Sequence, residues 1–316
     1  MNIELKFTLI WALIIIPFFA GSILRGKILS PQLTAKRLIR VNLFFLEPLI
    51  LFWTIWGMKL HAEVAILPAA GISTVIIGFL LGKAMLKVLK LDGISADSYL
   101  ISSTLANQGM TLGGLICYLI AGEQGLALAT IYVVYYLPFV FVFIFPFAKY
   151  ASVRHNPDSG EKPAATFRDF INFFFNLQNL PLAAIIAALV FQGFSIQRPD
   201  MFFPLDYLLF AAITVYYLTL GINFQPGHIS AAFKEQSALA VSKFLILPLL
   251  TFITLSFVEL DHTVETVIQI QSFMPAAIYS VISSILFDLD AKLTSGLFVV
   301  NSLLFLGIVL PAMLLF

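Results

Sequence analysis

The sequence predicts an all-α membrane protein of ten transmembrane helices, built as two inverted five-helix repeats in which the fourth and ninth helices are broken. Three observations support this fold class. Of the 316 residues, 60% are hydrophobic and 11% are charged, whereas an average soluble domain has about 25% charged residues. Ten apolar stretches are long enough to cross a bilayer, which takes about 20 helical residues. The fourth and ninth stretches are both interrupted near their middle.

The ten expected spans use nearly the whole chain, so little is left for a soluble domain. They are 7–24, 41–58, 64–86, 98–121, 125–148, 178–196, 202–221, 237–258, 263–287 and 293–316. One long connection, which contains a hydrophilic run, separates the first five spans from the last five. We therefore expect a first repeat over 1–148, a cytoplasmic linker over 149–177 and a second repeat over 178–316.

The distribution of positive charge predicts the orientation. Fourteen of the eighteen Lys and Arg residues lie in odd-numbered loops, three lie on the other side, and Lys243 lies within a span. The positive-inside rule then places the odd-numbered loops in the cytoplasm and both termini outside. Only Lys6 precedes the first span, so we expect an uncleaved helix and no signal peptide. The expected location is a cell membrane, specifically a bacterial inner membrane.

Weak internal similarity favours an inverted repeat. Because each half has five spans, an odd number, the second half must run with the opposite topology. The fifth span begins GLALATIYVVYYLPF and the tenth begins KLTSGLFVVNSLLFL, while the third and eighth carry Pro68 and Pro248. Together with the matching interruptions, these similarities indicate a transporter built from inverted-topology repeats.

The two interruptions predict the substrate site. Asn107-Gln108-Gly109 and Gly113-Gly114 interrupt the fourth span, and Gln269, Gln271, Ser272 and Pro275 interrupt the ninth. Broken helices at corresponding places in two repeats point to a binding site at the bilayer midplane. The freed backbone groups cannot face lipid, but they can line a cavity.

In the fourth span, we expect Asn107, Gln108, Gly109, Thr111, Gly113 and Gly114 to contact a substrate or an ion. Asn107 and Gln108 point about 100° apart on a helix, so one packing contact cannot accommodate both. Their amides and the N–H groups of a half-helix suit a carboxylate. The alternative is helix packing, in which Thr and Gly permit close approach.

In the ninth span, the expected site residues are Gln271, Ser272, Pro275 and Tyr279. Pro275 removes a backbone donor and opens the helix, and Gln271 and Ser272 lie one turn before it. A simple proline kink is the alternative reading. Tyr279 follows one turn later and is expected to line the same cavity.

Glu47 and Lys243 are the two ionisable residues well inside spans, at a similar depth of roughly 10 Å by the helix rise. Intramembrane charges are costly and are usually functional. They would form a charge pair, or Glu47 would couple transport to protons. The alternative is that Lys243 extends its ammonium to the interface and Glu47 is protonated or hydrated.

Several classes of protein are not expected. The sequence contains no phosphate-binding loop, no dinucleotide fingerprint and no HExxH motif. The lone Cys117 can form neither an intrachain disulfide nor a metal site, and a net charge of +1 suggests no nucleic-acid partner. We expect no enzyme, cofactor or metal. An enzyme would need clustered His, Asp or Ser side chains, and a sensor would need a soluble output domain.

Three local motifs carry a resemblance to a known family. They are Asn107-Gln108-Gly109 with Leu112-Gly113-Gly114 and the turn Gly122-Glu123-Gln124-Gly125, then Phe273-Met274-Pro275-Ala276-Ala277, and finally Asn301-Ser302-Leu303 through Leu310-Pro311. With these motifs, the chain resembles the auxin efflux carrier family of permeases, within the bile-acid-symporter and arsenite-transporter-like group. The resemblance covers essentially the whole length. Members usually have a proline in the fourth-span break, where this chain has Gly114.

The resemblance implies two domains interleaved in the sequence. Spans 1, 2, 6 and 7 would form a scaffold, often the interface of a homodimer. Spans 3–5 and 8–10 would form a transport domain in which spans 4 and 9 cross as broken helices. The implied function is a secondary transporter or permease that moves a small organic anion, a carboxylate, across the lipid bilayer by an elevator-like motion. An Na⁺- or H⁺-coupled symporter or antiporter of the same fold is the alternative, although spans four and nine contain no mid-span Asp or Glu.

Overall fold

The computed structural model describes residues 3–58, 62–155, 180–223 and 232–315. These residues form helices joined by short connections, with one isolated antiparallel β-bridge and no longer β-strand among them. Seven helical stretches are long and apolar enough to cross a membrane: Thr8–Arg25, Leu33–Gly57, Glu63–Leu89, Met110–Tyr132, Leu205–Ile222, Phe233–Leu255 and Ala291–Leu314. The prediction of an all-helical chain with long apolar helices is therefore confirmed, and the ten spans in two inverted repeats stay a prediction.

Not every expected span is one long helix. The expected sixth span contains a shorter apolar helix, Leu180–Gly193. The expected fourth and ninth spans are each divided by a non-helical segment, and this division is why neither of them is one long helix. The expected fifth span, 125–148, is shared between the end of one helix and the start of the next, because a turn falls at residues 133–135.

Packing divides the chain into two units. The first comprises Met1–Leu60, Gly122–Ala127 and Ile171–Pro226, and the second comprises His61–Ala121, Leu128–Phe170 and Gly227–Phe316. The described helices of expected spans 1, 2, 6 and 7 thus fall in the first unit. Whether the units act as a scaffold and a transport domain stays a prediction.

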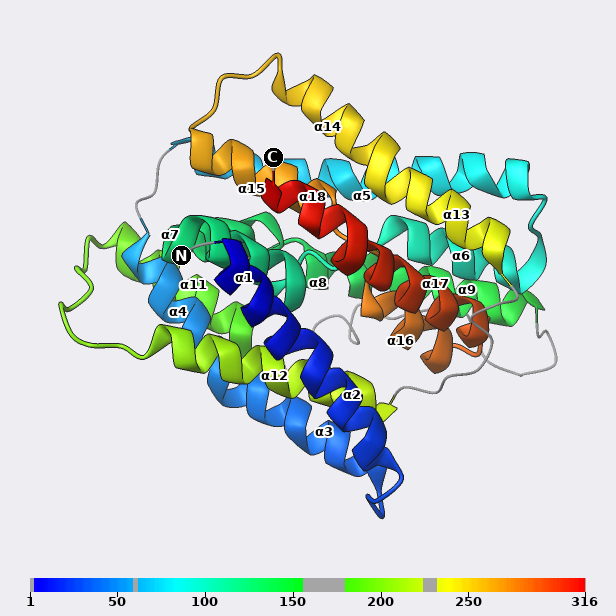
Figure 1. Ribbon diagram of the computed structural model, residues 1–316. Helices are drawn as coiled ribbons and strands as arrows, with labels where there is room; N and C mark the ends of the chain where they lie inside the picture. The colour runs from blue at the N-terminus through cyan, green and yellow to red at the C-terminus, as the bar shows by residue number, and fades with distance from the viewer. Residues whose placement is uncertain (1–2, 59–61, 156–179, 224–231, 316) are drawn as a thin grey trace. The chain divides into compact units, whose positions relative to one another are not determined.

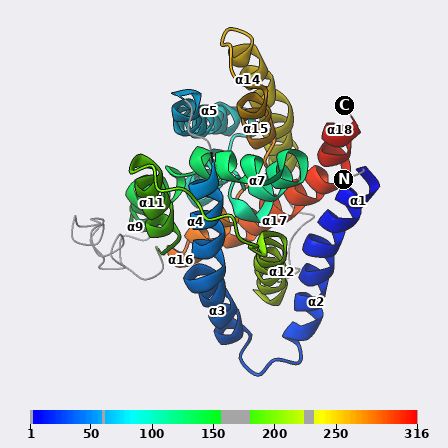
Figure 2. The ribbon, with the colours of Figure 1, turned by 90° about the vertical axis from the view of Figure 1, so that its left-hand side faces the viewer.

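The helices of the first unit run into one another through π-helical turns. They are α1 (Ile3–Ile10), η1 (Trp11–Ile15), α2 (Ile16–Arg25), α3 (Pro31–Val41), η2 (Asn42–Leu46), α4 (Glu47–Gly57), α11 (Leu180–Gly193) and α12 (Leu205–Asn223). Figure 2 shows α3 and α4 as one continuous rod. Pro31 occupies the first turn of α3, where a missing N–H costs no hydrogen bond. Pro48 follows the π-helical turn η2 inside the continuous rod.

Two glycines let α2 and α12 pack backbone to backbone. A Cβ atom on Gly21 would lie 2.9 Å from the backbone nitrogen of Ile222, and one on Gly221 would lie 2.9 Å from that of Ser22. Real side chains do not approach this closely, so only glycine fits either position. Small residues at membrane helix interfaces allow such contact, and van der Waals packing then stabilises the pair.

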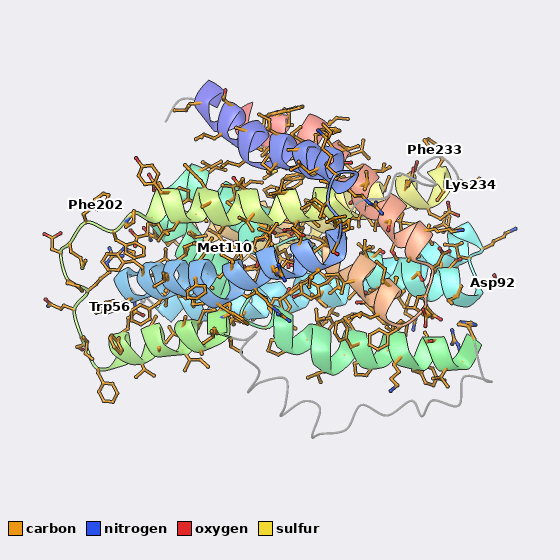
Figure 3. All side chains as sticks on the ribbon, turned by 90° about the horizontal axis from the view of Figure 1, so that it is seen from below. Trp56, Asp92, Met110, Phe202, Phe233 and Lys234 are labelled. Carbon is orange, nitrogen blue, oxygen red and sulfur yellow. The ribbon has the colours of Figure 1, made fainter. Side chains whose placement is uncertain are left out.

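One end of the first unit is held by side chains that bind backbone carbonyls. Trp56 Nε1 donates to Ile196 O at 2.7 Å, and Gln192 Nε2 donates to Ile55 O at 2.5 Å. Arg198 pairs with Glu123 and lies over the Trp53 ring, 4.7 Å from its centroid. Figure 3 shows Trp56 and Phe202 at this end, where α11 and α12 are joined.

The second unit holds the remaining helices (Figure 1). They are η3 (Ala62–Ala65), α5 (Ile66–Leu89), α6 (Gly93–Thr104), η4 (Met110–Gly114), both ends of α7 (Leu115–Tyr132), α8 (Tyr136–Phe139), η5 (Val140–Ile144), α9 (Phe145–His155), α13 (Phe233–Val241), η8 (Ser242–Ile246), α14 (Leu247–Leu255), α15 (His262–Ser272), α16 (Ile278–Leu286), α17 (Ala291–Leu304), η9 (Phe305–Val309) and α18 (Leu310–Leu315). Its core includes Tyr99, Leu239, Ala276 and Leu297, which are buried together.

Two expected boundaries need correction. The expected turn at Gly122–Gly125 lies inside α7, although Gly122 has a φ of 62°, a left-handed conformation that bends the chain there. The expected linker over 149–177 begins too early, because α9 continues to His155. Arg154 Nη2 donates to Asp97 Oδ2 on α6 at 2.6 Å, which holds this last turn. The rest of that linker, 156–179, lies outside the described residues.

The packing of α2 against α12 leads to a stability prediction. Gly21→Ala should lower the melting temperature of the purified protein by several degrees, because an added methyl group forces the two backbones apart, at a cost of about 1–3 kcal/mol. Gly26→Ala is the matched control, since a Cβ there meets nothing within 4 Å. Equal melting temperatures for the two variants, measured in the same detergent, would contradict this packing.

Candidate functional site

The two interruptions pair with each other. In the first, α6 ends at Thr104 and the chain is non-helical to Gly109; in the second, α15 ends at Ser272 and α16 begins at Ile278. Asn107 N donates to Pro275 O at 2.8 Å, and Ala277 N donates to Leu105 O at 3.3 Å. Ala106 and Ala276 thereby form the antiparallel bridge. We call residues 105–109 and 273–277 the crossover.

Gln108 fastens the crossover to its surroundings. Its side chain is fully buried, and Nε2 donates to Gln271 O at 3.2 Å and to Tyr132 Oη at 3.5 Å. Tyr135 donates its hydroxyl proton to Gln108 Oε1 at 3.0 Å. The hydroxyl of Tyr132 also lies 2.7 Å from Thr74 Oγ1. A chain of hydrogen bonds therefore fixes the amide of Gln108 in one orientation.

Gln271 lies against the first break from the end of α15. Its Nε2 is 3.8 Å from Cys117 Sγ, a weak acceptor, and its Oε1 has no hydrogen-bond partner although the side chain is fully buried. Gly113 leaves the space in which this oxygen sits. An unpaired buried acceptor costs about 1–3 kcal/mol, so Oε1 of Gln271 is available to a donor that enters the site.

The half-buried Asn107 keeps its side chain largely available. Thr111 Oγ1 donates to Asn107 Oδ1 at 3.0 Å, which leaves the amide nitrogen of Asn107 as the outward donor. The backbone N–H of Gly114 donates to Gly109 O at 2.9 Å and closes the π-helical turn η4. Proline has no N–H, so the glycine at this position makes a bond that the proline usual in the resembled family could not make.

Two of the expected site residues are engaged elsewhere. Ser272 Oγ donates to Gln269 O of its own helix at 2.7 Å. The Tyr279 ring packs beside Tyr136 at 5.8 Å between centroids and borders an apolar cluster. The hydroxyl of Ser272 therefore faces its own helix, and Tyr279 packs among apolar residues. The other expected site residues lie at the crossover: Asn107, Gln108, Gly109, Thr111, Gly113, Gly114, Gln271 and Pro275.

Asn301 belongs to the site, although the sequence reasoning placed it only in a family motif. Its Oδ1 accepts from Ala276 N at 3.3 Å, while its buried Nδ2 has no partner. When Tyr132-Val133-Val134 is aligned with Phe298-Val299-Val300, Tyr135 falls opposite Asn301. Each of these two side chains binds the break of its own half. This alignment of the two halves is the sequence signal that could have identified Asn301.

Lys243 is the charged residue at the crossover. It lies on the π-helical turn η8, is 1% exposed, and donates from Nζ to Leu105 O at 3.1 Å. In Figure 3, Asp92, Phe233 and Lys234 lie at the same end of this unit, where α6 and α13 begin. Leu105 and Lys243 are twelve and ten residues from the starts of their helices, hence about 15–18 Å along them.

Lys243 lies further from the start of its helix than expected, because α13 begins four residues before the expected span. Its expected depth of roughly 10 Å in the membrane stays a prediction. The lysine does not extend to the interface. Glu47, at the start of α4, accepts a hydrogen bond from Tyr216 Oη at 2.5 Å. Glu47 and Lys243 belong to different units, and their pairing stays a prediction.

Helix ends give the crossover a mixed electrostatic character. The stretch from Met110 and helix α16 both begin there, and neither N-terminus has a side-chain cap. The positive ends of their dipoles favour an anion. Helices α6 and α15 end there, and Lys243 offsets the negative end of α6 at Leu105 O. Among the described residues, no group of three or more His, Cys, Asp or Glu is arranged to hold a metal ion.

The contact between Gly113 and Gln271 gives a second prediction. Gly113→Ala should weaken substrate binding at least tenfold, because its methyl group would displace Gln271 Oε1 and press on Gln108 O. Gly307→Ala, a change outside the crossover in which the added Cβ meets nothing within 4 Å, should bind as the natural chain does. Ligand-induced thermal shifts of both variants test this, and equal loss in both would contradict the packing described.

Comparison with known proteins identifies the family. The model of the membrane transport protein family matches residues 6–313. The chain is also 25% identical over 238 residues to a protein named as an uncharacterized transporter of Methanocaldococcus jannaschii, covering 74% of this chain and 72% of that protein. The chain belongs to the membrane transport protein family, which is the auxin efflux carrier family. It is a multi-pass membrane transport protein and not an enzyme.

Proposed function

We propose that the chain is a secondary transporter or permease for a small organic anion, and that the crossover is its substrate site. The observation that carries the proposal is the hydrogen-bonded pairing of two interrupted helices, Asn107 N to Pro275 O and Ala277 N to Leu105 O. Inside a membrane, non-helical backbone is tolerated where protein buries it or where it lines a cavity. In transporters, such breaks hold the substrate.

The groups around the crossover favour an anion. Two uncapped helix N-termini begin there, and the amide nitrogens of Asn107 and Asn301 have no described acceptor. The buried amino group of Lys243 adds a further donor. A carboxylate accepts hydrogen bonds from all three kinds of donor. Malonate, malate and an aromatic carboxylate are the substrates that we would test first.

The two units support an elevator-like mechanism. All crossover residues lie in the second unit, so that unit would carry the anion while the first serves as the scaffold, in a homodimer or alone. The equivalent roles of Tyr135 and Asn301 at the two breaks support ten spans in two inverted repeats. The charge asymmetry of the loops supports termini outside a bacterial inner membrane.

A cation-coupled symporter or antiporter is the second candidate. The unpaired Oε1 of Gln271 is an acceptor that an Na⁺ ion or a protonated group could use. Leu105 O, at the negative end of α6, is already taken by Lys243, which disfavours a metal cation at that carbonyl. Thermal shifts measured with and without Na⁺ at several pH values separate these cases.

The proposal predicts that Asn107→Ala abolishes the stabilisation by the bound carboxylate, with a loss of affinity above tenfold, or about 1.4 kcal/mol. Folded yield should hardly change, because the bond to Pro275 O uses the backbone of residue 107. Gln269→Ala is the control, since that amide donates to Glu265 on its own helix. Wild-type affinity in Asn107→Ala would exclude this site.

A further inference from the structure

The buried Lys243 has no counter-charge among the described residues of its own unit. Its Nζ donates to an uncharged carbonyl, Leu105 O, and no described carboxylate of the unit lies within 4.0 Å of it. The ion pairs that the described residues do form join Arg154 and His155 to Asp97 and Arg198 to Glu123. Lys243 is therefore a deeply buried amine that donates to the Leu105 carbonyl and has no ionic partner among the described residues.

The described charged and titratable groups on the elements around Lys243 do not supply an ionic partner for it. Those elements carry Lys83 and Lys87 on α5, Asp97 and Tyr99 on α6, Lys234 and Glu235 on α13, and Lys292 on α17. The four lysines are exposed, and Asp97 is bound by Arg154 and His155. Glu235 is two helical turns before Lys243 on the same face of the helix, about 12 Å along the axis.

An isolated ammonium ion is too costly to keep in an apolar interior, so such a group gives up its proton or acquires a partner. A neutral amine still donates one N–H to Leu105 O. A substrate carboxylate at the crossover is the partner that would make the charged form favourable, because the two opposite charges then neutralise each other at short range.

We propose that Lys243 takes up one proton when the substrate anion binds, so that anion and proton occupy the crossover together. This rests on the proposed function. The amine nitrogen uses its lone pair to bind the proton, and the resulting ammonium pairs with the carboxylate. With a monocarboxylate such as phenylacetate, the occupied site then has no net charge added, whereas a dicarboxylate such as malonate or malate adds one negative charge instead of two. The carrier would thus be an anion–proton symporter that requires no metal cation.

The test counts protons. Binding of malonate, malate or phenylacetate to the purified full-length protein is measured by calorimetry at pH 8, where the free carboxylates are ionised, in HEPES and in Tris. These buffers differ in ionisation enthalpy, so the difference in heat gives the number of protons exchanged. We expect the uptake of about one proton per anion. The dissociation constant should then rise up to tenfold per pH unit as the pH increases.

Variants identify the group that takes up the proton. Lys243→Arg keeps a permanent charge, so it should bind the anion without proton uptake, and Lys243→Met should bind at least tenfold more weakly. Lys234→Met, a change at an exposed lysine of the same helix, should behave as the natural chain does. If the natural protein binds a carboxylate without taking up a proton, or if uptake persists in Lys243→Arg, the inference is wrong and the proposed function stands. If none of the three anions binds, the proposed function itself fails.

Discussion

The structure depends on satisfying the backbone groups that two interrupted membrane helices leave open. Inside a bilayer no water is available to them, and each unsatisfied group costs several kcal/mol. The chain solves this by pairing the breaks with each other, through Asn107 and Pro275 and through Ala277 and Leu105. Each break thus supplies backbone partners to the other, and the candidate site lies at that pairing.

The two breaks are related but not equal. Tyr135 supports the first through Gln108, and Asn301 supports the second through Ala276. Among the described residues, the first break alone has a buried lysine amine on a freed carbonyl, where Lys243 donates to Leu105 O. A symmetric crossover would offer the same groups to a ligand from both halves. Because of this asymmetry, the lysine amine lies at one helix end, beside Leu105 O. A substrate bound there would orient its carboxylate towards that end.

Sequence reasoning could place the breaks because their causes are local. Pro275 lacks a donor, and polar or glycine residues such as Asn107 and Gly109 stand out in an apolar run. The residues that bind these breaks from distant parts of the sequence were harder to predict. Lys243 and Leu105 are 138 residues apart, and the depth of a lysine depends on where its helix begins, which an apolar pattern gives to within a few residues. The hydroxyl of Ser272 was assigned to the site because spacing cannot distinguish a side chain that bonds its own helix.

The pairing of the breaks is tested most directly by a disulfide across the bridge. Ala106 and Ala276 are a pair without mutual hydrogen bonds, whose Cα atoms should be about 4.5 Å apart, within the range for a disulfide of about 4.4–6.8 Å. In a Cys117→Ser background, Ala106→Cys with Ala276→Cys should oxidise with the loss of two hydrogens by intact mass and still bind the carboxylate. Ala106→Cys with Ala277→Cys, one residue out of register, should not. Two free thiols in the folded first variant, or equal oxidation of both, would contradict a substrate site built on this crossover.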